Sequence, residues 1–161
     1  MGTPTSTPAS LLRDTDSALF RAKDAGRARW HFFDDAMHAQ AVARLTLEDE
    51  LRRALTCHEF VLHYQPIVRL SDSVVVGHEA LVRWRHPVRG LLGPEDFLEV
   101  AEDSGLIVGI GHQTLDQVCA LLARDRTLPG PVNVNFSAVQ LSARDWRAGF
   151  VETVLRHGVD L

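Results

Sequence analysis

The sequence predicts an α/β fold in which a β-hairpin is followed by alternating helices and strands. Segments 59–69 and 74–84 are rich in apolar, β-prone residues, and the turn cluster Ser71-Asp72-Ser73 separates them. So short a connection favours an antiparallel pair. Helical patterns then precede another strand candidate at 131–137, and strands separated by helices are typical of a parallel sheet. We therefore expect an antiparallel hairpin that leads into a parallel α/β arrangement.

Proline and glycine set the bounds of the elements that come after the hairpin. Pro87 ends the second strand, because proline cannot donate a hydrogen bond to a sheet. Proline is also favoured in the first turn of a helix, and glycine just after its end. The expected elements are a loop at 89–93, a helix from Pro94 to Gly105, a helix over 107–124, and a last helix over 143–157 capped by Ser142.

Three segments are expected ahead of the hairpin. Residues 1–8 are rich in Thr, Pro and Ser, and we expect them to have no fixed structure. Residues 9–29 carry apolar residues at helical spacing and lead into a short strand candidate at 29–33, and we take 9–34 as one segment. Residues 35–56 are predicted to be a connecting helix. The remaining residues, 57–161, make up the α/β domain.

Composition excludes several classes of protein. The 161 residues are 45% hydrophobic and 24% charged, as is usual for a soluble globular domain. The net charge is −4 and the 17 basic residues are dispersed, which does not favour a nucleic-acid partner. Cys57 and Cys119 lie far apart with no CxxC motif, so we expect a reduced, cytoplasmic protein. We also expect no membrane span, because no apolar run approaches 18 residues.

The chemistry is concentrated in the run Gly-His-Glu-Ala-Leu-Val-Arg-Trp-Arg-His-Pro at 77–87. Glu79 is a carboxylate in an apolar strand, which is costly unless it is paired or binds a metal. Alternate residues of a strand share a face, so Glu79, Leu81 and Arg83 point the same way. That face combines an anionic metal ligand, an apolar platform and a guanidinium suited to phosphate.

This run, preceded by Tyr64-Gln65-Pro66 and followed by Val134-Asn135-Phe136-Ser137, resembles the N-terminal half of EAL domains. These are cyclic-di-GMP phosphodiesterases with a modified TIM barrel whose first strand is antiparallel to the others. The resemblance implies a partial barrel of this type and a role in bacterial cyclic-di-GMP signalling. It also implies hydrolysis of cyclic di-GMP to linear pGpG at a site with two divalent metals, Mg²⁺ or Mn²⁺.

The resemblance also assigns roles to individual residues. Glu79 and Asn135 match the family's catalytic metal ligands, and the Phe-Ser after it selects Asn135 over Asn133. Arg83 matches the residue that binds a phosphate oxygen, and in the absence of ligand we expect it to pair with Glu79. The other positions that match substrate contacts are Gln65, Leu81 and Pro94.

A second resemblance concerns residues 14–29, which are similar to the last helix and strand of GGDEF diguanylate cyclase domains. Lys23 and Arg27 match basic positions that lie near nucleotide phosphates in that family. They are also what a solvated helix end would carry. The signature GG(D/E)EF loop is absent from the sequence, so the segment resembles a remnant and the whole chain a fragment of a GGDEF–EAL protein.

Activity of the isolated chain is a separate question. The acidic motifs, lysine and glutamine that complete the EAL family's catalytic site do not occur in these 161 residues. We therefore expect the chain to be inactive alone, because catalytic residues act as a unit. Two alternatives stay open. The chain could be a degenerate cyclic-di-GMP-binding module, or an interaction module that forms a homodimer or pairs with a complementing EAL half through exposed barrel edges.

Overall fold

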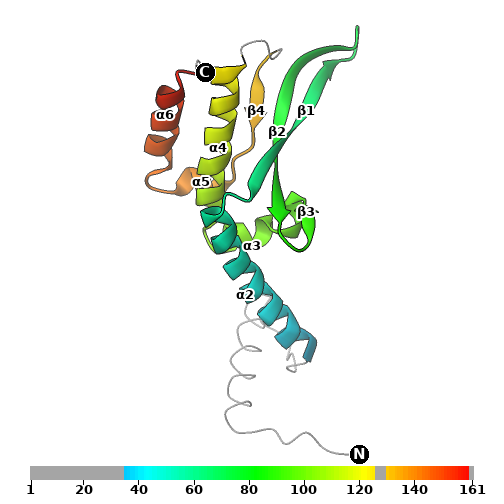
Figure 1. The fold of residues 1–161 in the computed structure, drawn as a ribbon, viewed down its shortest axis with the longest axis vertical. Helices are drawn as coiled ribbons and strands as arrows, with labels where there is room; N and C mark the ends of the chain where they lie inside the picture. Colours follow the sequence, from blue (N-terminus) through cyan, green and yellow to red (C-terminus); the bar gives the residue numbers. More distant parts are fainter. Residues whose placement is uncertain (1–34, 126–129, 160–161) are drawn as a thin grey trace, which may run out of the picture. The chain divides into compact units, whose positions relative to one another are not determined.

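The structure is a computed structural model that describes residues 35–125 and 130–159 (Figure 1). The predicted segments 1–8 and 9–34, and with them the resemblance to a GGDEF remnant, lie outside the described residues. The chain divides into two units, Met1–Leu45 and Thr46–Leu161. The second unit contains every predicted site residue.

The predicted hairpin is confirmed. Strand β1 (Phe60–Arg69) pairs antiparallel with strand β2 (Val74–His86), and Gln65 lies directly opposite Glu79. Strand β3 (Gly90–Leu92) adds a second antiparallel partner to β2. The sequence analysis expected a loop here and was wrong, because a strand of three residues is too short to show an alternating pattern.

The predicted parallel pairing is formed by strand β4 (Val132–Val134), which lies beside β2 with Asn133 opposite Glu79. The backbone N–H of His78 donates to the carbonyl of Pro131 at 2.9 Å and extends this pairing by one residue. The sheet is therefore mixed, with β2 at its centre and β1 running against it (Figure 1). This confirms the predicted α/β fold with an antiparallel first strand.

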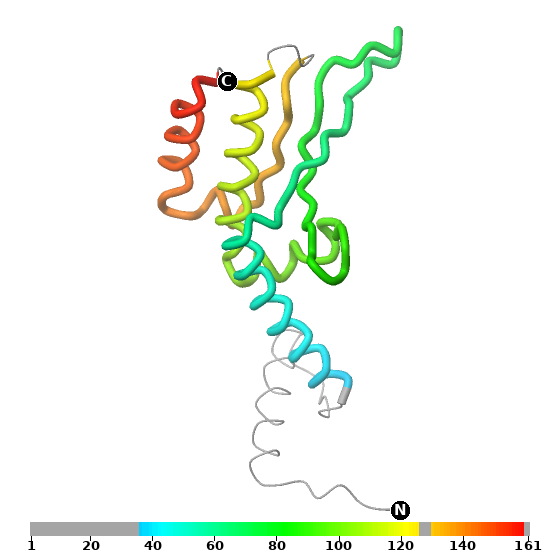
Figure 2. Tube along the Cα trace, viewed as in Figure 1, coloured from blue at the N-terminus to red at the C-terminus, as the bar shows by residue number. Residues whose placement is uncertain are grey.

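Helices account for most of the remaining described residues, and the chain path between them can be followed in Figure 2. The helices predicted over 35–56 and 107–124 are confirmed in full. The helix predicted from Pro94 is divided at Phe97 into a 3₁₀ turn and a short α-helix. The elements are α2 (Asp35–Thr56), η1 (Pro94–Asp96), α3 (Leu98–Asp103), α4 (Ile107–Arg124), α5 (Ala138–Ser142) and α6 (Trp146–His157).

The last predicted helix begins differently from the expectation. Ser142 is not a helix cap; it is the final residue of α5. Ser137 is the cap of that helix, and its hydroxyl accepts from the N–H of Gln140 while the Gln140 carboxamide accepts from the N–H of Ser137 at 2.7 Å. This capping box is readable in the sequence as Ser-x-x-Gln. The longer helix α6 starts only at Trp146.

The main core lies between one face of β1 and β2 and the helices α2, α3 and α4. Trp84 is fully buried at its centre, with its ring centroid 5.8 Å from those of both Phe60 and Phe97. The other buried members of this cluster are Leu51, Ala54, Ala101, Ile107 and Ile110. Burial of large side chains of this kind contributes about 1.5–3 kcal/mol each, so this cluster holds the hairpin to the helices.

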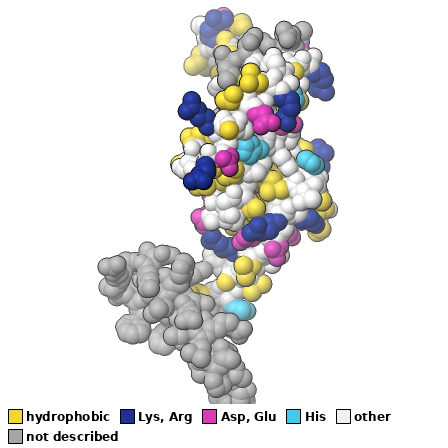
Figure 3. All heavy atoms as spheres, turned by 90° about the vertical axis from the view of Figure 1, so that its left-hand side faces the viewer, with side chains coloured by type: hydrophobic (Ala, Val, Ile, Leu, Met, Phe, Trp, Pro, Cys, Tyr) yellow, Lys and Arg dark blue, Asp and Glu magenta, His cyan; other side chains and the backbone are white. Residues whose placement is uncertain are grey.

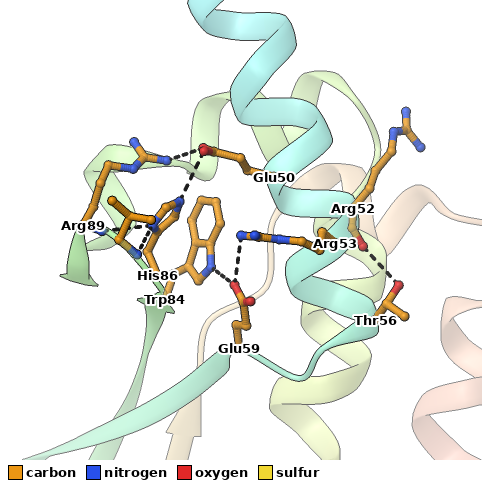
Figure 4. Close-up of polar contacts among 9 residues, drawn as sticks. Glu50, Arg52, Arg53, Thr56, Glu59, Trp84, His86 and Arg89 are labelled. Carbon is orange, nitrogen blue, oxygen red and sulfur yellow. Dashed lines mark hydrogen bonds and ion pairs between the residues drawn. The ribbon is translucent and has the colours of Figure 1, made fainter.

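Polar contacts around Trp84 fix the C-terminal half of α2 to the end of β2 (Figure 4). The Trp84 indole N–H donates to Glu59 at 2.9 Å, and Arg53 of α2 lies 3.7 Å from the same carboxylate oxygen. Arg89 lies over the Trp84 ring, 5.6 Å from its centroid. Satisfying the indole in this way removes the cost of an unpaired buried donor.

His86 completes this set of contacts and is held in one tautomer. Its Nδ1 accepts from the backbone N–H groups of Val88 and Arg89 at 3.1 and 3.0 Å, so the proton is on Nε2. That nitrogen faces Glu50 at 3.4 Å, and Glu50 also accepts from Arg89 at 2.6 Å. We call Glu50, Glu59, Trp84, His86 and Arg89 the α2–β2 clasp.

Within the described ranges, no helix combines the length and the hydropathy that crossing a bilayer requires. Figure 3 shows acidic and basic side chains interspersed on the face that carries α6.

The close approach of β4 to β2 depends on Gly130. Its φ is +72°, and a Cβ there would lie 1.9 Å from the carbonyl oxygen of Val76. We predict that Gly130→Ala lowers the free energy of unfolding by roughly 1–3 kcal/mol more than Gly90→Ala. Gly90 is a matched control, since its φ is +77° but nothing lies within 4 Å of a built Cβ. Equal losses in urea denaturation would contradict the steric argument.

Candidate functional site on strand β2

The site is built around a contact between the two predicted metal ligands. The Nδ2 group of Asn135 donates to Glu79 Oε1 at 2.7 Å. Fifty-six residues separate them in the sequence. They meet because β4 runs parallel to β2 and Asn135 directly follows its last residue, on the face of the sheet that Glu79 occupies. The structure therefore brings together the two residues that the sequence analysis paired.

Gln65 lies on the same face. It is directly opposite Glu79 on β1, while Asn133 is directly opposite Glu79 on β4. Residues directly opposite in a sheet have Cβ atoms about 4.5–5.5 Å apart. Glu79 therefore has an amide side chain on each side of it in the sheet. Asn133 was set aside in the sequence analysis, and only the register of β4 reveals its place beside Glu79.

Leu81, Pro94 and Asn135 are brought together by a cavity of about 340 Å³. The cavity opens where β4 ends, and its walls include the start of η1 and the segment 135–137. Besides Asn135, its polar lining groups are Glu102, Thr114, Ser137 and Gln140. A larger cavity of about 530 Å³ between α4, β4 and α6 contains none of the predicted site residues and is mostly apolar, so the smaller cavity is the better candidate.

Arg83 is the one predicted residue whose contact differs from the expectation. We expected it to pair with Glu79, but its Nη1 donates to the carbonyl of Val82 at 2.8 Å. The reason is geometric, because four residues along a strand span about 13 Å. Among the described residues, no carboxylate forms an ion pair with Arg83, so its guanidinium is available to an anionic ligand.

The segment that carries Asn135 is fixed by a capping box and by packing against helix α4. The capping box of Ser137 and Gln140 fixes the backbone immediately after it, and Gln140 is 3% exposed. Helix α4 approaches this turn closely at Gly111, where a Cβ would lie 1.8 Å from the Gln140 amide and 2.7 Å from the Trp146 ring. Asn135 is therefore positioned by the packing of Ser137 and Gln140, which follow it in the chain.

Side chains alternate between the two faces of the hairpin, so the core residues lie on the face opposite the candidate site. Tyr64 lies opposite Ala80, which is 4% exposed and belongs to the core side. Burial raises the pKa of the Tyr64 hydroxyl, so this phenol stays protonated at physiological pH. Its immediate neighbours on β1, His63 and Gln65, are exposed on the site face.

The donor atoms at Glu79 and Asn135 fit a hard divalent cation. A carboxylate oxygen and a carboxamide oxygen are ligands that Mg²⁺ and Mn²⁺ prefer. The contact at 2.7 Å already brings the two side chains to the same point, and half a turn about the Asn135 Cβ–Cγ bond presents its oxygen in place of the nitrogen. Among the described residues, no three His, Cys, Asp or Glu side chains cluster as a metal site would require.

The site thus combines a carboxylate–amide pair on one face of an open-edged mixed sheet with a half-buried arginine further along the same strand. Comparison with known proteins identifies its family. The family model for the EAL domain matches residues 48–160. The chain belongs to the EAL domain family, which confirms the resemblance found in the sequence.

Curated relatives support this assignment over most of the chain. The bifunctional diguanylate cyclase/cyclic di-GMP phosphodiesterase MucR of Pseudomonas aeruginosa is 40% identical over 157 residues, which cover 93% of this chain and 22% of MucR. The cyclic di-GMP phosphodiesterase PdeR of Escherichia coli is 39% identical over 135 residues, which cover 83% of this chain and 20% of PdeR. The chain thus spans about a fifth of the length of these relatives.

Solved structures agree with the fold. The PaMucR phosphodiesterase in complex with c-di-GMP is 38% identical, with a TM-score of 0.65 over 71% of this chain and 47% of that one. The EAL enzyme Bd1971, in its form bound to cAMP and cyclic di-GMP, is 25% identical with a TM-score of 0.69, over 97% of this chain and 42% of that one. Both likenesses confirm the predicted partial barrel.

The carboxylate–amide pair generates a prediction about metal binding. In NMR titrations, Mn²⁺ should broaden the backbone amide signals near Glu79 and Asn135 before those elsewhere, because a paramagnetic ion acts at short range. Glu79→Gln should abolish this selectivity, since it removes the anionic ligand. Glu152→Gln, an exposed change on α6, is the control and should leave the broadening unchanged. If Glu79→Gln showed the same selective broadening as the unmodified chain, metal binding by Glu79 would be contradicted.

Proposed function

We propose that this chain is the substrate-recognising part of a metal-dependent phosphodiesterase that acts on cyclic di-GMP in bacterial signalling. The observation that carries the proposal is the Glu79–Asn135 contact at the end of the parallel pair β2–β4. The names of the relatives support it, since MucR and PdeR are described as cyclic di-GMP phosphodiesterases. In the same proposal, 57–161 is the N-terminal part of the EAL domain and 35–56 a connector that comes after a GGDEF remnant at 9–34.

The cyclic dinucleotide would lie along the face of β2 that carries Glu79, Leu81 and Arg83. Arg83 carries a planar fork of N–H donors that matches a phosphate oxygen pair, and its present bond to a backbone carbonyl is easily exchanged. Leu81 offers an apolar surface beside it, and Pro94 borders the same cavity. Gln65 supplies both an amide donor and an acceptor next to Glu79.

Glu79 and Asn135 would hold the divalent cation, proposed to be Mg²⁺ or Mn²⁺. When bound, the cation supplies charge neutralisation of the phosphate and lowers the pKa of water. The residues of this chain then have distinct tasks. Glu79 contributes the negative charge, Asn135 fixes the carboxylate from one side, and Arg83 holds the phosphate. We propose that turnover requires further acidic groups that the described residues do not gather.

The proposed setting is the cytoplasm, where the two cysteines stay as thiols. Both are free in the structure, and Cys119 is buried. Burial and the nearby Asp116 carboxylate raise the pKa of the Cys119 thiol, while Arg156 lowers it, so little reactive thiolate forms at neutral pH.

The first prediction of this proposal concerns binding. Isothermal titration of the chain with cyclic di-GMP in the presence of Mg²⁺ should show saturable binding, and Arg83→Ala should weaken it roughly 10- to 100-fold, as expected for loss of a charge-assisted bond. Arg69→Ala is the matched control, because Arg69 lies at the far end of β1 and its ion pair among the described residues is with Asp72 on the surface. If neither Arg83→Ala nor Arg69→Ala changed the affinity for cyclic di-GMP, binding at this face of β2 would be contradicted.

The second prediction concerns turnover. With Mg²⁺ or Mn²⁺, the isolated chain should produce no pGpG above a no-protein control in a chromatographic assay, because two ligands leave the catalytic unit incomplete. Turnover that disappears in Glu79→Ala would show that the chain is a complete enzyme. If the chain neither binds nor hydrolyses but elutes as an oligomer, the interaction alternative is favoured instead.

A further inference from the structure

The β1–β2 register places one more side chain on the site face, that of His63. It lies directly opposite Leu81, and it is exposed. Residues directly opposite in an antiparallel pair share a face, and successive rows on that face are about 7 Å apart. The three rows of the site face are Gln65–Glu79, His63–Leu81 and Val61–Arg83.

A ligand that contacts both outer rows of the site face must also pass over the middle row, His63–Leu81. In the proposed function, Gln65 and Arg83 both contact the cyclic dinucleotide, and about 13 Å of strand separates their rows. A ligand that bridges this distance lies across His63 and Leu81. Leu81 lines the candidate cavity, and a ligand in this position would also cover His63, the partner of Leu81 on β1.

The other histidines that accompany it in the unit have structural tasks or lie elsewhere. His86 belongs to the α2–β2 clasp, and His157 contacts Asp116 at 2.8 Å. His112 packs on Trp146 with ring centroids 4.6 Å apart, and His78 lies opposite Pro66 on the other face of the hairpin. Within the described part of the chain, no hydrogen bond or ion pair engages the imidazole of His63, which leaves its ring free for a ligand.

We propose that His63 is a ligand-contacting specificity residue whose ring stacks on a purine base of the cyclic dinucleotide. The proposal rests on the proposed function, because cyclic di-GMP is the ligand in question. A flat imidazole beside an apolar leucine is a suitable platform for a base, and histidine is among the side chains on which bases stack.

The test compares three variants in the same calorimetric titration with cyclic di-GMP and Mg²⁺. His63→Ala should weaken binding roughly 5- to 100-fold, the range expected when one stacked base loses its aromatic partner. His63→Phe keeps a flat ring and should bind within about threefold of the unmodified chain. His58→Asn is the control, an exposed histidine at φ +54°, where asparagine is well tolerated.

The outcomes separate this proposal from the function on which it rests. If His63→Ala binds as tightly as the unmodified chain while Arg83→Ala does not, the role of His63 is wrong and the proposed function stands. If His63→Phe is as weak as His63→Ala, stacking is wrong. If the unmodified chain does not bind cyclic di-GMP, both proposals are overturned. Heteronuclear NMR spectra of each variant establish that it is folded, which the exposure of His63 leads us to expect.

Discussion

The alternation of side chains along β2 is the constraint on which the rest of the structure depends. The strand is 13 residues long and carries core residues and site residues in turn. Ala80, Trp84 and His86 are each at most 4% exposed, whereas Glu79 and Arg83 point to the other face. A shift of register by one residue would exchange the two sets. The burial of Trp84 therefore also decides where the carboxylate and the guanidinium point.

The α2–β2 clasp makes that register still harder to change. Trp84 cannot leave its place without losing its bond to Glu59, and His86 cannot turn without leaving two backbone N–H groups unpaired. All three hydrogen bonds come from the core face of the strand that carries the site on its other face. The family model begins at residue 48, inside α2, so the helical half of the clasp lies within the matched region.

Much of this could be predicted from the sequence, because the signals were local and strong. The hairpin was indicated by two β-rich runs and a short turn, and helix α4 by its apolar stripe. The errors fell where local signals compete. Ser142 and Ser137 both resemble helix caps, and only the partner Gln140 distinguishes them. Strand β3 has no pattern of its own and forms because β2 is long enough to pair with it.

The site was harder to predict than the fold, because the sequence of one segment does not show which residues of other strands lie beside it. Glu79, Leu81 and Arg83 could be placed on one face by counting along β2, but Asn133 and His63 acquire their places only through pairing. Counting also suggested that Arg83 and Glu79 could pair, although strand geometry keeps them apart. The Glu79–Asn135 contact depends on three residues of β4 and the tight passage at Gly130. The place of Asn135 beside Glu79 therefore depends on the packing of a glycine five residues before Asn135 and 51 residues after Glu79.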